Sequence, residues 1–184
     1  MAIQKTLITA DELFRMPDDG QRHELVEGEL RTMSPAGGEH GVVAARFLIV
    51  IDRHVQAGNL GYTFAAETGF KTARDPDTVR APDVAFVAAG RFAGGQLPKD
   101  FPDLAPDLVV EVVSPGDRAE EVEEKVHDWL RAGVRLVLVA YPSTRSVTAY
   151  RSTTEVTMLR EADELDAGDV LPGFRCPVRD LFPA

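Results

Sequence analysis

The nearly continuous apolar run at residues 107–113, DLVVEVV, constrains the fold of this chain more than any other feature. Runs of this kind are typical of strands that are covered on both faces of a sheet. Residues 134–141, VRLVLVAY, predict a second buried strand. Between the two runs the sequence predicts a helix over residues 118–131, with Asp117 as its cap and Gly133 as its end.

Further helices and strands are predicted on both sides of this core. Thr9 and Glu12 form a capping box, which opens a short helix that ends at Met16. Residues 39–57 carry apolar side chains at helical spacing, and Gly58 follows as a stop. Strands are expected within residues 22–33 (a pair around a Glu27-Gly28 turn), 60–72 and 79–88, and as a hairpin of 146–150 with 154–159.

This order of elements predicts a mixed α/β (α+β) fold in which a mixed β-sheet is flanked by helices. The chain has 184 residues and shows no repeat or long linker, so we expect a single domain over residues 1–184. Apolar residues make up 44% of the chain, which is enough for a core without disulfides.

Composition also limits the functional classes. The chain has 30 acidic and 20 basic residues, a net charge of −10, which argues against a surface that binds nucleic acid throughout. Any such contact would need a local basic patch, metal ions or a partner. Cys176 is the only cysteine, the N-terminus lacks the apolar segment of a signal peptide, and no apolar run reaches the roughly 18 residues of a membrane span. A cytoplasmic protein is expected.

Glu111 lies in the middle of the apolar strand 107–113. An isolated ionised carboxylate in a core costs several kcal/mol, so Glu111 must be paired, protonated or bound to a metal ion. A structural salt bridge, or a position at the exposed end of the strand, explains Glu111 equally well when it is considered alone.

Asp83 lies within the predicted strand 79–88 and faces the same way as Ala85 and Val87. If this strand neighbours the Glu111 strand, two carboxylates meet at one place and repel each other unless a cation lies between them. Oxygen ligands of this kind suit Mg²⁺ or Mn²⁺, ions that can activate a water molecule and neutralise charge on a phosphate.

Lys125 is predicted at the edge of the buried stripe of helix 118–131, on the same side as Val122 and Trp129. From there its ammonium group could hold an attacking water or stabilise a phosphate in the transition state. A lysine that reaches back to solvent is the alternative.

Three further residues are weaker candidates. Glu24 is read as a solvated acid, and His40 as a capping or surface residue at a helix N-terminus. Arg46 projects from the same helix as His40 and could contact phosphates, with a solvated surface position as the alternative.

Six segments of the chain resemble the Uma-two family of restriction-endonuclease-like proteins. These segments, which together span nearly the whole length in the family's order, are TADELFRMPDDGQRHELVEGELRTMSP, GGEHG, VRAPDVAFV, PDLVVEVVSPGD, EKVHDWLRAGV and LPGF.

The resemblance implies a restriction endonuclease-like PD-(D/E)xK core with a divalent metal ion held by Asp83, Glu111 and the main-chain carbonyl of Val112. It also implies Glu24 as a further active-site acid and His40 as an accessory residue. The superfamily usually places a lysine two residues after the glutamate, where this chain has Val113. The family is similar to this chain in placing its lysine on the following helix, which corresponds to Lys125.

Three hypotheses follow from the residues and the resemblance. The first is a metal-dependent DNA endonuclease, the second is a catalytically inactive nuclease-fold module for binding or assembly, and the third is a purely structural cluster of acids and lysine. A homodimer is also expected, on the basis of apolar loop residues that we predict to be exposed: Phe92, Leu97 and Phe101.

Overall fold

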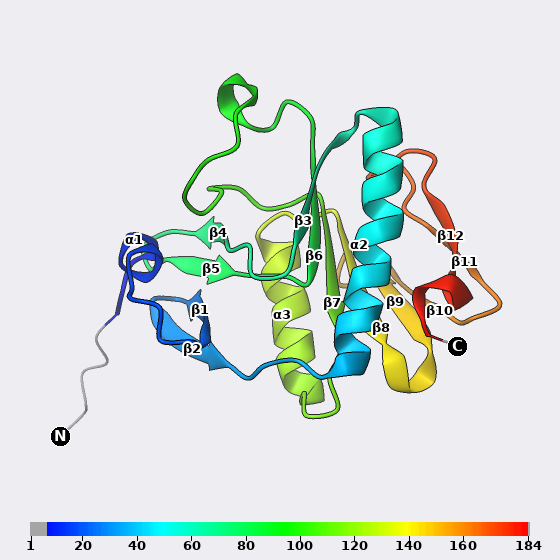
Figure 1. Cartoon of the computed structure of the whole chain (residues 1–184), viewed down its shortest axis with the longest axis horizontal. Coiled ribbons are helices and arrows are strands. Elements are labelled where there is room, and N and C mark those ends of the chain that lie inside the picture. The colour runs from blue at the N-terminus through cyan, green and yellow to red at the C-terminus, as the bar shows by residue number, and fades with distance from the viewer. Residues whose placement is uncertain (1–6, 184) are drawn as a thin grey trace.

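The computed structural model describes residues 7–183 and is built around a mixed sheet of six strands in the order β10-β9-β8-β7-β6-β3 (Figure 1). Only β7 and β8 run parallel, and the helix α3 connects them. The six strands are β3 (Gly61–Ala65), β6 (Val84–Ala88), β7 (Leu108–Val112), β8 (Leu136–Tyr141), β9 (Ser146–Tyr150) and β10 (Val156–Leu159).

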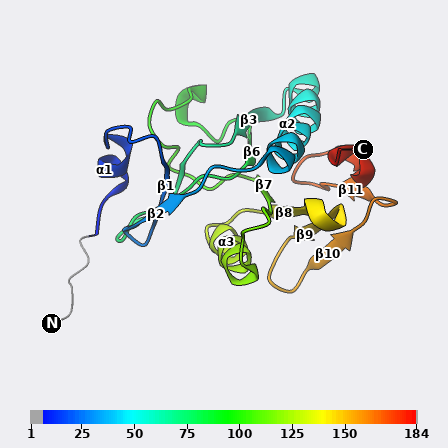
Figure 2. The same cartoon turned by 60° about the horizontal axis from the view of Figure 1, so that its bottom comes forward.

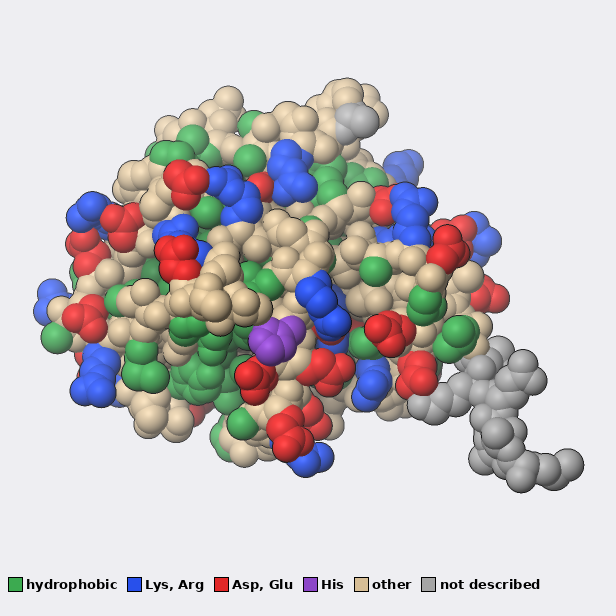
Figure 3. All heavy atoms as spheres, turned by 180° about the vertical axis from the view of Figure 1, so that it is seen from behind, with side chains coloured by type: hydrophobic (Ala, Val, Ile, Leu, Met, Phe, Trp, Pro, Cys, Tyr) green, Lys and Arg blue, Asp and Glu red, His purple; other side chains and the backbone are tan. Residues whose placement is uncertain are grey.

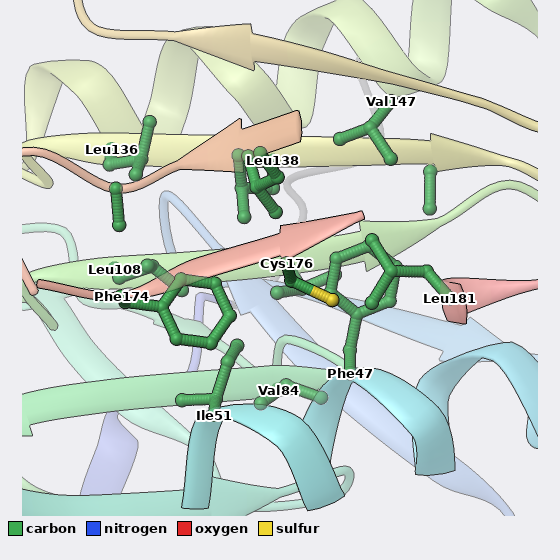
Figure 4. Packing of buried hydrophobic residues seen from close by; sticks show 14 of the residues in the cluster. Phe47, Ile51, Val84, Leu108, Leu136, Leu138, Val147, Phe174, Cys176 and Leu181 are labelled. Carbon is green, nitrogen blue, oxygen red and sulfur yellow. The ribbon is translucent and has the colours of Figure 1, made fainter. Parts of the chain in front are cut away.

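Two helices cover the opposite faces of this sheet, as the sequence predicts. On one face, α2 (Gly38–Gly58) buries Phe47 and Ile51 against Val84 and Leu108, and the C-terminal segment closes the same core (Figure 4). On the other face, α3 (Ala119–Arg131) buries Val126 and Trp129 against Ala85, Val109 and Val137. Adjacent strand residues point to opposite faces, so each strand contributes to both cores.

A second, four-stranded sheet in the order β2-β1-β5-β4 packs with the short helix α1 (Ala10–Phe14). Its antiparallel strands are β1 (Arg22–Val26), β2 (Glu29–Met33), β4 (Phe70–Ala73) and β5 (Thr78–Arg80). The prediction of one strand over 79–88 is therefore wrong, because β5 belongs to this sheet and β6 to the main sheet. Pro82, between the two strands, has no N–H for a ladder, which explains the break.

Helix and strand boundaries otherwise lie close to the predicted ones, with two differences. Asp117 does not cap α3: its carboxylate accepts a hydrogen bond from the Ser114 N–H at 2.8 Å, while Glu121 accepts one from the Arg118 N–H at 3.3 Å. The sequence also did not indicate the two-stranded sheet near the C-terminus. The short elements are β11 (Glu164–Asp166), β12 (Arg175–Pro177) and the 3-10 turns η1 (Ala93–Gly95), η2 (Pro142–Thr144) and η3 (Val178–Leu181).

Two of the three apolar loop residues on which we based the homodimer are not exposed. Phe92 is only 6% exposed, in the core beneath α3, and Phe101 is half-buried with its ring packed edge-on against Phe14. Leu97 alone of the three is exposed, so the basis for that prediction was wrong. Across residues 7–183, no helix combines the length and the apolar character needed to cross a bilayer.

Candidate functional site

A pocket of about 670 Å³ lies where the two sheets meet α3. One wall is the β1–β2 ribbon with the following loop, 34–37, and the other is the loop 113–117 with the first turns of α3. Figures 1 and 2 both show the ribbon beside α3. Among the lining residues are Glu24, His40, Arg80, Asp83, Glu111, Val112 and Lys125.

Glu111 projects from the penultimate position of β7 and is 8% exposed. Its Oε1 accepts a hydrogen bond from Trp129 Nε1 at 2.8 Å, and its Oε2 lies 3.4 Å from Lys125 Nζ. Burial raises the pKa of Glu111 to about 6, although the Lys125 charge opposes this shift; Asp83 and Glu24 add to it. Glu111 therefore lies close enough to the other two carboxylates to be affected by their charge.

Asp83 immediately precedes β6, and its N–H extends the β6–β7 ladder by donating to the Val110 carbonyl at 3.1 Å. Its Oδ2 accepts a hydrogen bond from the Val112 N–H at 2.7 Å and lies 3.1 Å from His40 Nε2 in the first turn of α2. The hydrogen bond with Asp83 raises the pKa of His40, in opposition to burial.

Glu24 is a buried acid at 3% exposure, so its interpretation as a solvated residue was wrong. It accepts hydrogen bonds from Arg80 Nη1 at 2.9 Å and from the Ala81 N–H at 3.1 Å, and it lies 3.6 Å from Lys125 Nζ. Arg80, itself 5% exposed, also binds Asp128 of α3. This arginine therefore joins the ribbon to the helix.

Lys125 lies between Glu24 and Glu111 on the pocket side of α3, which confirms its predicted position at the edge of the buried stripe. Burial lowers the pKa of Lys125, but the charges of Glu111 and Glu24 raise it more strongly, so it stays above its ordinary value. The lysine is therefore an ammonium ion at neutral pH.

Negative charge is in excess in this buried network. Four carboxylates, those of Glu24, Asp83, Glu111 and Asp128, face the two permanent cations Arg80 and Lys125, together with the titratable His40. Within residues 7–183, no three His, Cys, Asp or Glu side chains are already arranged as a metal-binding cluster.

The structure thus brings together Asp83, Glu111, Lys125, Glu24, His40 and the backbone of Val112, but not Arg46. The Arg46 guanidinium donates to the main-chain carbonyls of Asp180 and Phe182, and in this way it attaches α2 to the C-terminal segment. We therefore leave Arg46 out of the candidate site.

Sequence reasoning missed the partners that hold the site together. Trp129 lies four residues after Lys125, one helical turn along the same face, and this spacing could have indicated a shared contact. Arg80 was visible as the only basic residue in the segment VRAPDVAFV. Its partners Glu24 and Asp128 lie 56 and 48 residues away along the chain, so no local pattern connects them.

Comparison with known proteins places this chain in a family. The model of the Uma2 family, described as "Putative restriction endonuclease", matches residues 10–179. The chain belongs to the Uma2 family. Curated proteins include no match to this Uma2 chain.

A solved structure has the same fold. The crystal structure of "a putative nuclease belonging to DUF820" from Anabaena variabilis is 20% identical, with a TM-score of 0.81 over 95% of this Uma2 chain and 97% of that chain. At this identity the similarity is evidence for the fold alone, and it confirms the predicted mixed α/β architecture.

Proposed function

We propose that this Uma2 protein is a Mg²⁺- or Mn²⁺-dependent endonuclease that hydrolyses DNA phosphodiester bonds, with residues 1–184 acting as one nuclease-like domain in the cytoplasm. One observation carries the proposal: Asp83, immediately before β6, and Glu111, on the adjacent strand β7, line one pocket together with the Lys125 ammonium. Family membership supports nuclease chemistry, and the site geometry indicates which residues would perform it.

The donor groups fit a hard divalent cation. Mg²⁺ usually keeps several waters and needs only one or two protein carboxylates in addition to substrate phosphate, so Asp83 and Glu111 suffice without a preformed cluster. The excess negative charge favours a cation here. Burial is the main cause of the raised pKa of Glu111, and the charges of Asp83 and Glu24 add to it.

The Val112 carbonyl is the third candidate ligand. The N–H and C=O of one strand residue point to the same side, and the Val112 N–H donates to Asp83. The Val112 carbonyl therefore points toward the chain that leads into β6, where Pro82 has no N–H to donate.

When bound, the ion would acidify a water molecule and neutralise charge on the phosphate. The chain's own residues provide the remaining functions. Trp129 and Val112 hold the two carboxylates in place, while Glu24 and Glu111 fix the Lys125 ammonium at the pocket wall. From there, Lys125 would donate hydrogen bonds to the attacking water or to a phosphate oxygen that gains charge.

Asp83→Asn tests the mechanism directly, since it keeps the side-chain size and removes the negative charge. We expect Mn²⁺-dependent cleavage of DNA to fall below about 1% of the wild-type rate while the fold survives. Asp180→Asn makes the same change on the exposed η3 segment and should cleave normally. Unchanged cleavage by purified Asp83→Asn would rule out the mechanism.

The alternative function is a catalytically inactive nuclease-fold module. The observation that favours it is that Lys125 and Trp129 already satisfy both oxygens of Glu111. Calorimetry with Mn²⁺ separates the two functions. If the protein is an endonuclease, the wild type binds the ion and Glu111→Gln does not. If it is an inactive module, the wild type binds no Mn²⁺ at millimolar concentration.

A further inference from the structure

The candidate active site lies at the bottom of a narrow pocket. The residues Glu24, Asp83 and Glu111 are only 3%, 7% and 8% exposed, and the pocket holds about 670 Å³ between two walls. A pocket of this size encloses a drug-sized molecule, which corresponds to roughly one or two nucleotides. A DNA duplex is broader, since its major groove alone is about 12 Å wide.

The wall formed by the β1–β2 ribbon carries arginines. Arg31 is the cross-strand partner of Glu24, and Arg22 lies two residues before Glu24 on the same strand, so all three share one face of the ribbon. Arg22 and Arg31 therefore flank Glu24 on the side that lines the pocket. Within residues 7–183, no carboxylate oxygen comes within 4.0 Å of the Arg31 guanidinium, which leaves its charge available to a ligand.

The opposite wall carries acids instead. Asp117 in the loop before α3, with Glu121 and Glu124 in the first turns of this helix, lines the pocket from that side. Charge is thus unevenly divided across the pocket: the ribbon carries Arg22 and Arg31 on either side of Glu24, whereas the α3 wall carries these three acids around the single ammonium of Lys125.

We propose that the substrate enters this pocket as a single unpaired strand, with its sugar–phosphate backbone along the β1–β2 ribbon and its bases toward the α3 wall. This inference rests on the proposed nuclease function. Arg22 and Arg31 contact phosphates next to the bond to be cleaved. The carboxylates of the α3 wall accept hydrogen bonds from the amino groups of bases, which a single strand exposes.

A duplex fits this distribution of charge poorly. Its second backbone would face the acidic wall, and binding along a duplex requires many neutralised phosphates. The chain has a net charge of −10, and on the face in Figure 3 acidic and basic side chains are interspersed. A paired substrate would therefore have to open before a phosphate could reach Asp83 and Glu111.

Three DNA substrates of one sequence test the inference in Mn²⁺: a single strand, a full duplex, and a duplex with an unpaired internal bubble. We expect the single strand and the bubble to be cut about tenfold or more faster than the duplex, which must first open its base pairs. Cleavage of the duplex at an equal or higher rate would overturn the inference.

Binding in Ca²⁺, measured by fluorescence anisotropy, separates this inference from the proposed activity. Tighter binding of the single strand supports the inference even if no substrate is cut, in which case only the proposed activity fails. Equal or tighter binding of the duplex, or no binding of either DNA, overturns it.

A charge variant tests where the backbone lies. Arg31→Gln should lower the slope of log affinity against log salt concentration for the single strand by about 0.7, the loss of one phosphate contact. Arg179→Gln makes the same charge change on the exposed η3 segment, outside the pocket lining, and should leave the slope unchanged. An unchanged slope in Arg31→Gln would contradict the placement of the backbone along the ribbon.

Discussion

The Glu111 carboxylate is buried, and its surroundings determine the pH at which it ionises. Its pKa rises from 4.5 to about 6, mainly through burial. Between these values the folded protein holds a proton on Glu111 that the unfolded chain releases. The contribution of the Glu111 carboxyl to the unfolding free energy is therefore fully present below about pH 4.5 and is lost as the pH rises through 6.

This linkage predicts a pH-dependent difference between wild type and Glu111→Gln in the absence of divalent ions. From pH 4.5 to 6, the unfolding free energy of the wild type should fall by about 1.3 kcal/mol relative to the variant. The remainder of a total of about 2 kcal/mol lies outside this range, since one pKa unit corresponds to about 1.36 kcal/mol. Urea unfolding of both proteins in EDTA at several pH values measures this difference in unfolding free energy. Parallel pH profiles for the two proteins would show that Glu111 is not perturbed in this way.

Single residues also show what sequence reasoning could reach. Asp83, Glu111 and Lys125 were predictable because each is a charge in, or at the edge of, an apolar pattern. Glu24 was misread because its burial depends on Arg80, which reaches it only after β5 pairs with β1.

At the scale of elements, the network of ion pairs joins the small sheet to α3. Arg80 of β5 binds Glu24 of β1 and Asp128 of α3, and all three side chains are at most 12% exposed. Helices and most strands were predictable from their periodicity. Their division into two sheets was not, because residues 79–88 read as one strand and only Pro82 marks the crossing.

We predict that Arg80→Met destabilises the protein by about 3–5 kcal/mol, because it removes the buried cation that Glu24 and Asp128 share and leaves them only the more exposed Lys125 and Arg131. Arg135→Met is the matched control: it removes an exposed ion pair with Asp169 and should cost at most about 1 kcal/mol. Chemical denaturation of both variants at neutral pH provides the comparison. Equal losses in the two variants would show that the Arg80 network does not hold the elements together.

For the whole molecule, an acidic protein with an acidic pocket should gain stability from divalent cations. At a Mn²⁺ concentration of about 100 times Kd, binding to the folded state alone adds about 2.7 kcal/mol, which for a chain of this size corresponds to roughly 5–10 °C in Tm. A thermal melt should show this rise in the wild type and not in Asp83→Asn. An equal rise in both proteins would indicate that the ion binds elsewhere on the acidic surface.

The location of the bound ion tests the proposed metal site at Asp83 and Glu111 most directly. A crystal soaked in Mn²⁺, with anomalous scattering recorded at the manganese edge, should show one peak between the Asp83 and Glu111 carboxylates and beside the Val112 carbonyl. A manganese peak only at exposed acids, or none in a pocket where Lys125 still contacts Glu111, would contradict a metal-dependent nuclease site.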